Sequence, residues 1–526
     1  MLEIVDMTEK TTPSEIPTNI SHNAPTSSSD EFVQRPQRVG PPDEIKRISE
    51  CVWELPTSYK SSMRVPARIY ATEGIINAMD AGVFDQVTNV ASLPGIVKYA
   101  YCMPDGHWGY GFPIGGVAAF DPAVGGVISP GGIGFDVNCG MRLITTNLMI
   151  DEVKPKIKQL VDELYKAVPA GVGCKGFVKI SKEEFTNVMV EGAQWCVKNG
   201  YAWPEDIDHI EDRGRITFAN PLKVSDRAVK RGFDQLGTLG SGNHYLEIQE
   251  VKEGMIFDPD VARAMGITKV GQVVVMVHCG SRGFGHQIAT DHLKVFLDVM
   301  PKYGIAVLDK ELACAPFNSP EGQDYYGAMA CAANMAFANR QVITQRIRDV
   351  FAHVFGRSAR EMEMNLVYDV AHNIAKVEKY KIDGVEKELV VHRKGSTRAF
   401  GPSRTADLPA VFAAKGIGQP VILGGSMETG SYLLVGVDGS EETFCSTAHG
   451  AGRTMSRAQA KREVHGRELQ KDMEKRGIYV HAVTMDGLAE EAGRAYKDVD
   501  DVVMALERAG ITKRVVALKP IGNVKG

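Results

Sequence analysis

Apolar residues recur along this chain with two different periods, so the pattern predicts both helices and strands. A helical spacing runs through residues 151–168 and through the alanine-rich stretch at 323–355. Short, continuous apolar runs at 273–277 and 366–370 are typical of buried strands. This mixture predicts an α+β protein with mixed sheets and surrounding helices.

The N-terminal segment departs from this pattern. From Thr8 to Pro42 the chain is rich in Thr, Ser, Pro and Asn and has few large apolar residues. Burial there cannot offset the entropy of ordering the chain, so we expect residues 1–42 to form a disordered polar tail. No linker-like stretch and no internal repeat divides the remainder, which predicts one large domain over residues 43–526.

Composition narrows the classes of function. Of the 526 residues, 44% are hydrophobic and 24% are charged, which is typical of a folded, soluble protein. Because the formal net charge is -5, any nucleic-acid contact must come from a local basic groove. Nine cysteines without a CxxC pair favour reduced thiols and a cytoplasmic location. The sequence has no signal-peptide pattern and no apolar run of about 20 residues, so we expect no membrane partner.

Two glycine-containing motifs suggest nucleotide chemistry but lack the right context. The segment 171–176 reads GVGCKG, yet a dinucleotide fingerprint follows a strand and opens a helix, whereas here a helix precedes and a strand-like 177–180 follows. Lys381 begins KIDG, which matches the lysine nucleophile motif of common nucleotidyltransferases. Asp383-Gly384 between alternating residues is a hairpin signal, so we interpret KIDG as a turn. No Walker A loop or HExxH helix occurs.

Five residues form a candidate metal-binding set. Asp136 and Cys139 lie three positions apart after a glycine-rich turn. His244, His278 and His372 each stand at a junction between a strand and a glycine-rich or loop segment, where ligand sites of sheet proteins often form. Each histidine alone is also consistent with a hydrogen-bonded structural role. Together the five can hold two divalent cations if the thiolate bridges them, and two-metal centres suit phosphoryl displacement.

Other polar residues could belong to the same cleft. Asp105 and His107 lie in a further glycine loop, where a plain turn is the alternative. His449 is surrounded by hydroxyl and small residues, with Arg453 four positions on. Histidine nitrogen can attack the α-phosphorus of a nucleotide, and arginine offers a planar fork for phosphate oxygens, although His449 could instead be structural. Cationic groups at Arg282 and at 392–398 could form the basic groove, or salt-bridged loops.

The order of these segments carries a family resemblance. The chain contains, in sequence, PDGHWGYGFPIGG, DVNCGMR, LGSGNHYLEIQ, HCGSRGFGHQ, DVAHN, HRKGSTRAF, GGSM, HGAGR and a terminal VKG. This series resembles the RtcB family of tRNA-splicing RNA ligases and covers nearly everything after the tail. Several independent strings agree in order, so the resemblance is specific.

The resemblance implies roles for named residues. It makes His449 the residue that carries GMP, and it makes Arg282 and Arg453 contacts of RNA phosphates. The ligands of two Mn2+ ions, with the cysteine shared, would be Asp136, Cys139, His244, His278 and His372. The GTP pocket would comprise Asn243, Glu247, Ser426, Ala451, Tyr496 and Lys525.

The implied reaction joins an RNA end bearing a 2',3'-cyclic phosphate or 3'-phosphate to a 5'-hydroxyl end, driven by GTP. It would serve tRNA splicing or RNA repair, with tRNA halves as substrates and an archease-like activator as a partner. Two rivals are a dimetal phosphodiesterase without nucleotidyl transfer and a non-catalytic RNA-binding scaffold. The sequence departs from the family pattern in its N-terminal extension, in Glu428 where many relatives carry glycine, and in Ala448 where many carry cysteine.

Overall fold

The computed structural model describes residues 39–526. The predicted tail lies outside these residues except for its last four positions. Val39 forms an isolated bridge with Asp80, and the Gly40 amide donates to the carbonyl of Met79 at 2.9 Å. The boundary of the tail at residue 42 therefore stays a prediction.

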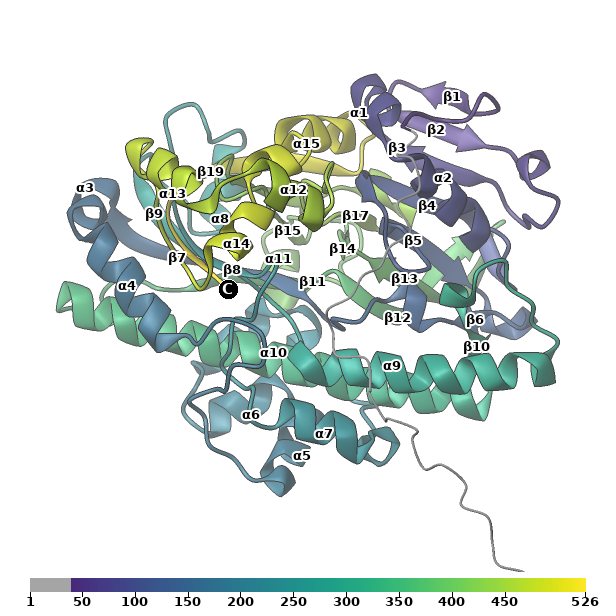
Figure 1. Cartoon of the computed structure of the whole chain (residues 1–526), viewed down its shortest axis with the longest axis horizontal. Helices are drawn as coiled ribbons and strands as arrows, with labels where there is room; N and C mark the ends of the chain where they lie inside the picture. The colour runs from purple at the N-terminus through teal and green to yellow at the C-terminus, as the bar shows by residue number, and fades with distance from the viewer. Residues whose placement is uncertain (1–38) are drawn as a thin grey trace, which may run out of the picture. The chain divides into compact units, whose positions relative to one another are not determined.

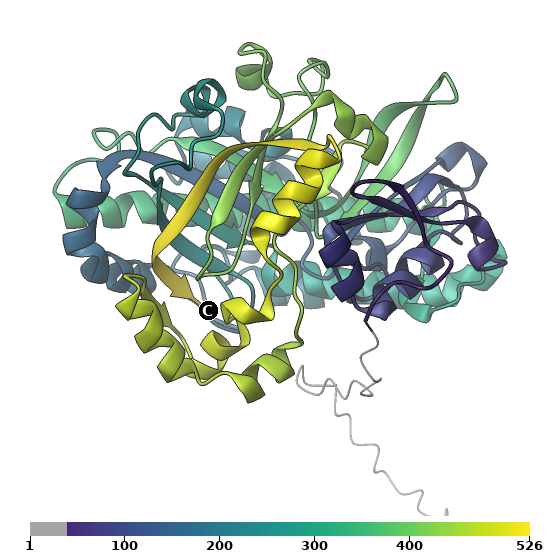
Figure 2. The same ribbon diagram turned by 90° about the horizontal axis from the view of Figure 1, so that it is seen from above.

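One large sheet carries most of the segments that contain the candidate site residues. Its strands follow the order β11 (Leu366–Ala371), β7 (Gly140–Met149), β9 (Gln272–Cys279), β8 (Tyr245–Glu250), β19 (Thr512–Lys525), β16 (Ser431–Gly436) and β15 (Pro420–Leu423), with β18 (Tyr479–Ala482) beside β19. All pairings are antiparallel except that of β18 with β19. Figure 2 shows β19 in yellow, running along this sheet to the C-terminus.

Strand β9 shows why the apolar run predicted a buried strand. Val273, Val275 and Val277 face the core that the sheet shares with helix α10 (Pro320–Phe355). Val274 and Met276 face a second core on the other side of the sheet. Both faces are covered, so every position is apolar and no alternation remains. The strand predictions at 273–277 and 366–370 are confirmed by β9 and β11.

A second sheet has seven strands in the order β1 (Lys46–Ser49), β2 (Val52–Leu55), β3 (Ala67–Tyr70), β4 (Ile96–His107), β5 (Ile114–Phe120), β13 (Val385–Lys394) and β12 (Asn373–Ile382). Its core includes residues of α2 (Ala81–Val90) and α15 (Val499–Arg508). Two short pairs complete the strands, β6 (Val127–Ile128) with β10 (Ala315–Pro316) and β14 (Ser396–Arg398) with β17 (Ser446–Ala448).

Helix α10 is the longest helix of the described residues and confirms the prediction at 323–355. Its ends follow from local chemistry: the Ser319 hydroxyl accepts the Gly322 amide, Pro320 fixes the first turn, and Gly356 ends the helix at φ 66°. Almost all of its middle is buried, including Asn339 and Arg340. In Figure 1 it lies alongside α9 (Arg282–Val299). Buried polar groups on such a helix must bond to neighbouring segments.

The remaining helices are α1 (Glu73–Ala78), α3 (Ile150–Val153), α4 (Ile157–Ala167), α5 (Lys182–Glu191), α6 (Ala193–Lys198), α7 (Asp226–Gly232), α8 (Pro259–Ala264), α11 (Ala410–Ala413), α12 (Arg457–Glu463), α13 (Gly466–Lys475) and α14 (Met485–Glu490). The helix predicted at 151–168 is divided into α3 and α4 by a short 3-10 turn containing Pro155, because proline disrupts helical hydrogen bonding. The content is α+β, as predicted. No helix within residues 39–526 is long and apolar enough to cross a bilayer.

Candidate active site

Five neighbouring strands bring distant segments to one end of the eight-stranded sheet. In β7, Met141 lies opposite Val370 of β11 and His278 of β9. His278 in turn lies opposite Tyr245 of β8, and Tyr245 lies opposite Lys525 of β19. The segments that enter or leave the sheet beside this row therefore meet, although they are far apart in sequence.

The structure brings the five candidate metal ligands together in a continuous line of donor atoms. Asp136 Oδ2 lies 2.9 Å from His244 Nε2, which lies 3.3 Å from Cys139 Sγ. Cys139 Sγ lies 3.2 Å from His278 Nε2, and that atom lies 3.2 Å from His372 Nε2. The thiol stands in the middle, so each end of the line offers a three-donor group that includes Cys139.

The donor set fits divalent cations. Ligand atoms bound at about 2.0–2.3 Å to one metal stand about 3–3.6 Å apart, close to the spacing of this line. Two imidazole nitrogens face each other across 3.2 Å, and Nδ1 of His372 has no hydrogen-bond partner among residues 39–526. Carboxylate, thiolate and imidazole donors suit transition metals. The arrangement therefore suits two cations that share the thiolate.

Burial controls the protonation of these donors. It raises the pKa of the Cys139 thiol to about 12, with a further contribution from Asp136, and it lowers the pKa of His278 and His372 well below the ordinary range. Burial opposes ionisation of Asp136, yet its hydrogen bond and charge interaction with His244 leave its pKa lowered. A bound cation would take the place of the protons on the thiol and on His244.

The surrounding backbone fixes the ligands. Nδ1 of His244 lies 3.1 Å from the Leu239 carbonyl, and a proton held there leaves Nε2 free to bind a metal. Arg340 of α10 donates to the carbonyls of Asn138 at 2.7 Å and Cys279 at 2.9 Å. Asn138 adopts the left-handed region at φ 55°, between Asp136 and Cys139. Arg340 thus holds two ligand-bearing segments at once.

His449 lies next to this line. The short strands β14 and β17 place Ser396 opposite Ala448, and the Ser396 amide donates to the carbonyl of His372 at 3.1 Å. As a result, the rings of His372 and His449 have centroids 4.6 Å apart. Gly395 packs between His449 and β5, because a Cβ there would lie 2.3 Å from Cγ2 of Ile114 and 3.2 Å from Cε1 of His449.

Asp105 orients His449. Its buried Oδ2 accepts from His449 Nδ1 at 2.6 Å and from the backbone amides of His449 at 3.2 Å and Gly450 at 3.4 Å. A carboxylate only accepts, so Nδ1 carries the proton and Nε2 presents its lone pair. His107 donates from Nδ1 to the Asp105 carbonyl at 2.9 Å, and burial lowers the pKa of His107 to about 4. Both residues thus lie beside His449.

A second group of candidate site side chains surrounds the buried carboxylate of Glu491. It lies 3.4 Å from Arg453 and 3.5 Å from Lys525, and the Tyr496 hydroxyl donates to it. Arg453 also donates to the Tyr496 hydroxyl at 3.2 Å. Burial opposes ionisation of Glu491, but Lys525, Arg457 and Arg453 lower its pKa to about 2. Three candidate nucleotide and RNA contacts are therefore organised by one residue that the sequence did not reveal.

Glu247 is buried close to this group. It accepts from Asn523 and from Gln249, both at 2.5 Å. Burial raises its pKa to about 7, although Gln249 and Lys525 oppose the rise. Asn243, which directly precedes the ligand His244, is half-buried, and its side chain makes no hydrogen bond within residues 39–526. It is therefore free to contact a ligand.

The other candidate site residues are held by backbone hydrogen bonds or at a helix start. The Ser426 hydroxyl accepts from the amides of Glu428 at 3.3 Å and Thr429 at 3.2 Å. The Ala451 amide donates to Gly424 at 2.9 Å, which anchors the chain directly after His449. Arg282 opens α9 at φ 57°, and its Nη1 lies 3.1 Å from Nδ1 of His244. A non-glycine residue held in that backbone region often marks a functional site.

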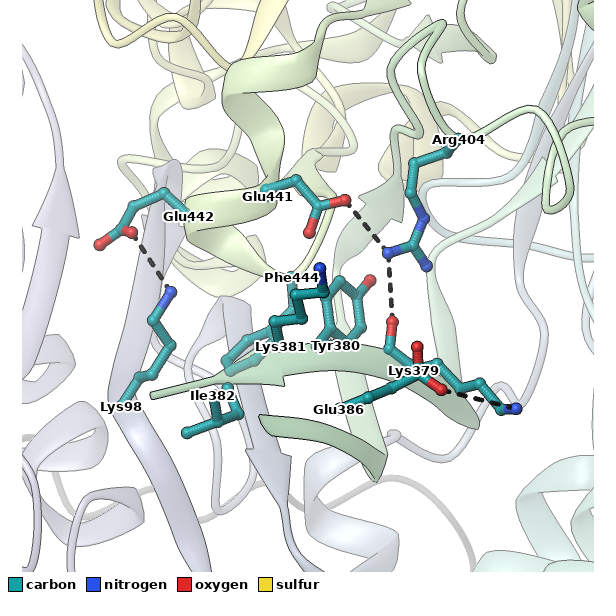
Figure 3. Close-up of a pocket in the computed structure, with 10 residues that line it drawn as sticks. All are labelled: Lys98, Lys379, Tyr380, Lys381, Ile382, Glu386, Arg404, Glu441, Glu442 and Phe444. Atoms are coloured by element: carbon teal, nitrogen blue, oxygen red, sulfur yellow. Dashed lines mark hydrogen bonds and ion pairs between the residues drawn. The ribbon is translucent and has the colours of Figure 1, made fainter. Parts of the chain in front are cut away.

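The competing lysine lies in a different pocket. Asp383 and Gly384 have φ values of 51° and 80° and join β12 to β13, so the hairpin prediction is confirmed. Lys381 lines a pocket of about 430 Å³, and Figure 3 shows its side chain between those of Lys98 and Arg404. The residues that line this pocket include no candidate metal ligand and no histidine. The pocket of Lys381 therefore includes neither His449 nor any residue of the metal-ligand line.

The GVGCKG segment is also a loop. Residues 171–181 contain no regular element, and α5 begins at Lys182 with Ser181 as its cap. The strand expected at 177–180 is thus wrong, because no neighbouring segment pairs with it. Instead the Gly171 amide donates to the Gly240 carbonyl at 2.7 Å. The loop packs beside the segment that leads to His244.

The family model and the similar proteins that match this chain all belong to one family. Residues 86–526 match the family model described as tRNA-splicing ligase RtcB. The chain belongs to the RtcB family. It is 51% identical over 483 residues to the tRNA-splicing ligase RtcB of Methanococcus maripaludis, covering 92% of this chain and 99% of that protein. The RtcB of Thermococcus kodakarensis is 52% identical with the same coverage. The RNA-splicing ligase RtcB homolog 1 of Entamoeba dispar is 47% identical, covering 90% and 89%.

One departure from the RtcB pattern has a structural partner. Glu428 accepts the Gly493 amide at 2.6 Å and pairs with Arg476. Its side chain thus connects the turn of Ser426 to the segment preceding Tyr496. Ala448 is buried in β17 and contributes no polar group to the site.

Proposed function

We propose that this protein is a GTP-dependent RNA ligase that joins 2',3'-cyclic phosphate or 3'-phosphate ends to 5'-hydroxyl ends. The observation that carries the proposal is the position of His449. Its Nδ1 is held by Asp105 at 2.6 Å, and its ring lies beside the last donor of the metal-ligand line. A histidine with a fixed tautomer next to a phosphoryl-transfer centre is suited to nucleophilic attack.

His449 performs the first group transfer in this proposal. Its Nε2 lone pair attacks the α-phosphorus of GTP, a P–N bond forms, and the bond to the leaving pyrophosphate breaks. The Nδ1 proton stays on the bond to Asp105, which stabilises the positive charge that develops on the ring. Where the RNA end is a 2',3'-cyclic phosphate, water first opens the ring to a 3'-phosphate and a free 2'-hydroxyl. An oxygen of the 3'-phosphate then attacks the phosphorus of GMP and the P–N bond to His449 breaks. Attack by the 5'-hydroxyl on the RNA phosphate releases GMP and seals the strand.

The metal-ligand line would hold two Mn2+ ions. Asp136, His244 and Cys139 would bind one ion, and Cys139, His278 and His372 would bind the other. When bound, these cations supply positive charge that stabilises phosphate oxygens during displacement. Their identity as manganese rests on the family resemblance, because the donor set alone accepts several metals.

The second group would form the guanine and RNA contacts. Tyr496 would stack on the base, Lys525 and Glu247 would bind its polar edge, and Asn243 would bind the nucleotide. Ser426 and Ala451 would line the pocket. Arg453 and Arg282 would hold RNA phosphates, and Arg453 must then exchange part of its present bonding with Glu491 for the substrate.

The biological setting extends the same proposal. The relatives' names point to tRNA splicing, so the substrates would be tRNA halves, with RNA repair as a further use of the same chemistry. We expect a cytoplasmic enzyme that works with an archease-like activator. A phosphodiesterase with the same metals would not need the bond between His449 and Asp105. A non-catalytic scaffold would need neither this bond nor the metals.

Covalent labelling tests the proposal. Purified protein is incubated with α-labelled GTP and MnCl2, and wild type is compared with His449→Ala and Lys381→Ala. Wild type and Lys381→Ala are expected to form an acid-labile adduct that is absent in His449→Ala. Circular dichroism and bound-metal analysis verify that each variant is folded. An adduct that survives in His449→Ala, or is lost only in Lys381→Ala, contradicts the assignment.

A further inference from the structure

A half-buried lysine supports the irregular end of β4, which holds Asp105. Nζ of Lys497 donates to the carbonyl of Pro104 at 2.9 Å and to that of Gly106 at 2.5 Å. These two carbonyls flank Asp105 on either side. The ammonium group therefore holds the backbone of β4 on both sides of Asp105, the residue that reaches His449.

The backbone ties the same lysine to the nucleophile segment. The Lys497 amide donates to the carbonyl of Gly452 at 2.9 Å. Gly452 itself is packed against this end of β4, because a Cβ there would lie 2.1 Å from the Asp105 carbonyl oxygen. Arg453 forms an isolated bridge with Tyr496. Three segments that are distant in sequence thus meet at Lys497, and one of them carries the candidate guanine-stacking residue.

Holding an ammonium group at this position costs free energy, because the group loses part of its hydration. Burial lowers the pKa of Lys497 to about 8, and the neighbouring Cys102 and Asp105 oppose that change. A buried ammonium group is retained only where hydrogen bonds and nearby charge compensate for lost hydration. Lys497 donates to two backbone carbonyls of β4, one on each side of Asp105. An apolar side chain of similar length would fill the space but leave both carbonyls unbonded.

We propose that Lys497 is a positioning residue for nucleotidyl transfer: it fixes the irregular end of β4 so that the Asp105 carboxylate meets Nδ1 of His449. This inference rests on the proposed function. Nζ of Lys497 is not hydrogen-bonded to His449, and Lys497 acts through Asp105. Its neighbour Tyr496 belongs to the candidate guanine pocket, so one short segment supports both the base and the nucleophile.

The test measures single-turnover formation of the labelled His449 adduct over a range of GTP concentrations. Lys497→Met keeps the length and removes the donors, and Lys497→Gln keeps one donor group on a shorter chain. Loss of an outer-shell support typically costs about 10- to 100-fold in activity. We expect a fall of that size in the rate constant at saturating GTP, with the half-saturating GTP concentration and the bound metal unchanged within about twofold. Lys497→Arg, which keeps the charge and the donors, is expected to recover part of the rate.

Lys156→Met is the matched control. Lys156 donates to the Val354 carbonyl at 3.0 Å, but its partner belongs to the end of α10. The rate constant of this variant should match wild type. A rate constant in Lys497→Met within twofold of wild type overturns the inference, and so does a loss confined to the amount of active protein. If the methionine variant does not fold, the same criteria apply to Lys497→Gln. An absence of adduct in wild type would instead contradict the proposed function.

Discussion

Replacing Asp105 by asparagine tests how the nucleophile is oriented. The Asp105 carboxylate is fully buried, and one of its oxygens accepts three N–H groups, the shortest from His449 Nδ1 at 2.6 Å. An amide oxygen can still accept these bonds, but it lacks the negative charge. Hydrogen bonds to charged groups contribute about 1.5–3 kcal/mol, against about 0.5–1.5 kcal/mol for neutral pairs.

The expected loss follows from these values. Removing the charge from one short bond and two longer bonds weakens transition-state stabilisation by about 2–3 kcal/mol in total. At 1.36 kcal/mol for each factor of ten, adduct formation should slow by about 30- to 150-fold. Asp105→Ala, which leaves all three donors without an acceptor, should lose more.

Rapid-quench measurement with α-labelled GTP gives the rate constant directly. Asp121→Asn is the control, because this buried carboxylate also caps a turn, accepting from the Ala123 amide at 2.9 Å, and pairs with Lys387 away from the site. It should form the adduct at the wild-type rate. If Asp105→Asn reacts within threefold of wild type, the argument that Asp105 fixes the tautomer and charge of His449 is refuted.

Three further predictions concern metal, nucleotide and stability. Cys139→Ser should reduce bound manganese from two ions per chain to one or none by elemental analysis, and retention of two ions would show that the thiol is not shared. Tyr496→Ala should raise the half-saturating GTP concentration by about 5- to 150-fold, as loss of about 1–3 kcal/mol of stacking implies, whereas Tyr496→Phe should change it little. Asp369 pairs in the interior with Arg340 and Arg142, so Asp369→Asn should lower the free energy of unfolding by about 3–5 kcal/mol in urea titrations.

The pH dependence of Asp369 has a definite sign. Burial raises the pKa of this carboxyl, but Arg340 and Arg142 outweigh burial and leave the pKa lowered. Because the folded pKa lies below the unfolded value of about 3.9, its stabilisation is complete above that value and is lost as the pH falls through the folded pKa. Urea titrations from pH 6 to pH 3 should show this loss in wild type and a smaller one in Asp369→Asn. Equal slopes would contradict the prediction.

Local sequence patterns predicted the helices and strands better than they predicted the residues that hold the site in place. The apolar run of β9 and the Asp383-Gly384 turn could be predicted because the signal lies within a few neighbouring residues. The three strand-end histidines could be proposed as ligands, but their meeting depends on strand register across the sheet, which no single segment encodes. The strand expected at 177–180 failed because strand formation needs a pairing partner.

The residues that hold the candidate site in place could not be identified from any sequence motif. Arg340 stands in an alanine-rich helix, where a single arginine is typical of a solvent-facing position. Its role appears only when α10 is packed beneath the ligand segments, where it donates to Asn138 and Cys279. Glu491 and Lys497 likewise belong to no motif. Residues that act through other residues are defined by packing, and therefore by the fold as a whole.

One measurement tests the central claim most directly. Crystals grown with MnCl2 and GTP would be examined by anomalous diffraction at the manganese edge. We predict two anomalous peaks, one on each side of Cys139 Sγ, and GMP density continuous with Nε2 of His449. Peaks elsewhere, a single peak remote from Cys139, or nucleotide joined to another side chain such as Lys381 would contradict it.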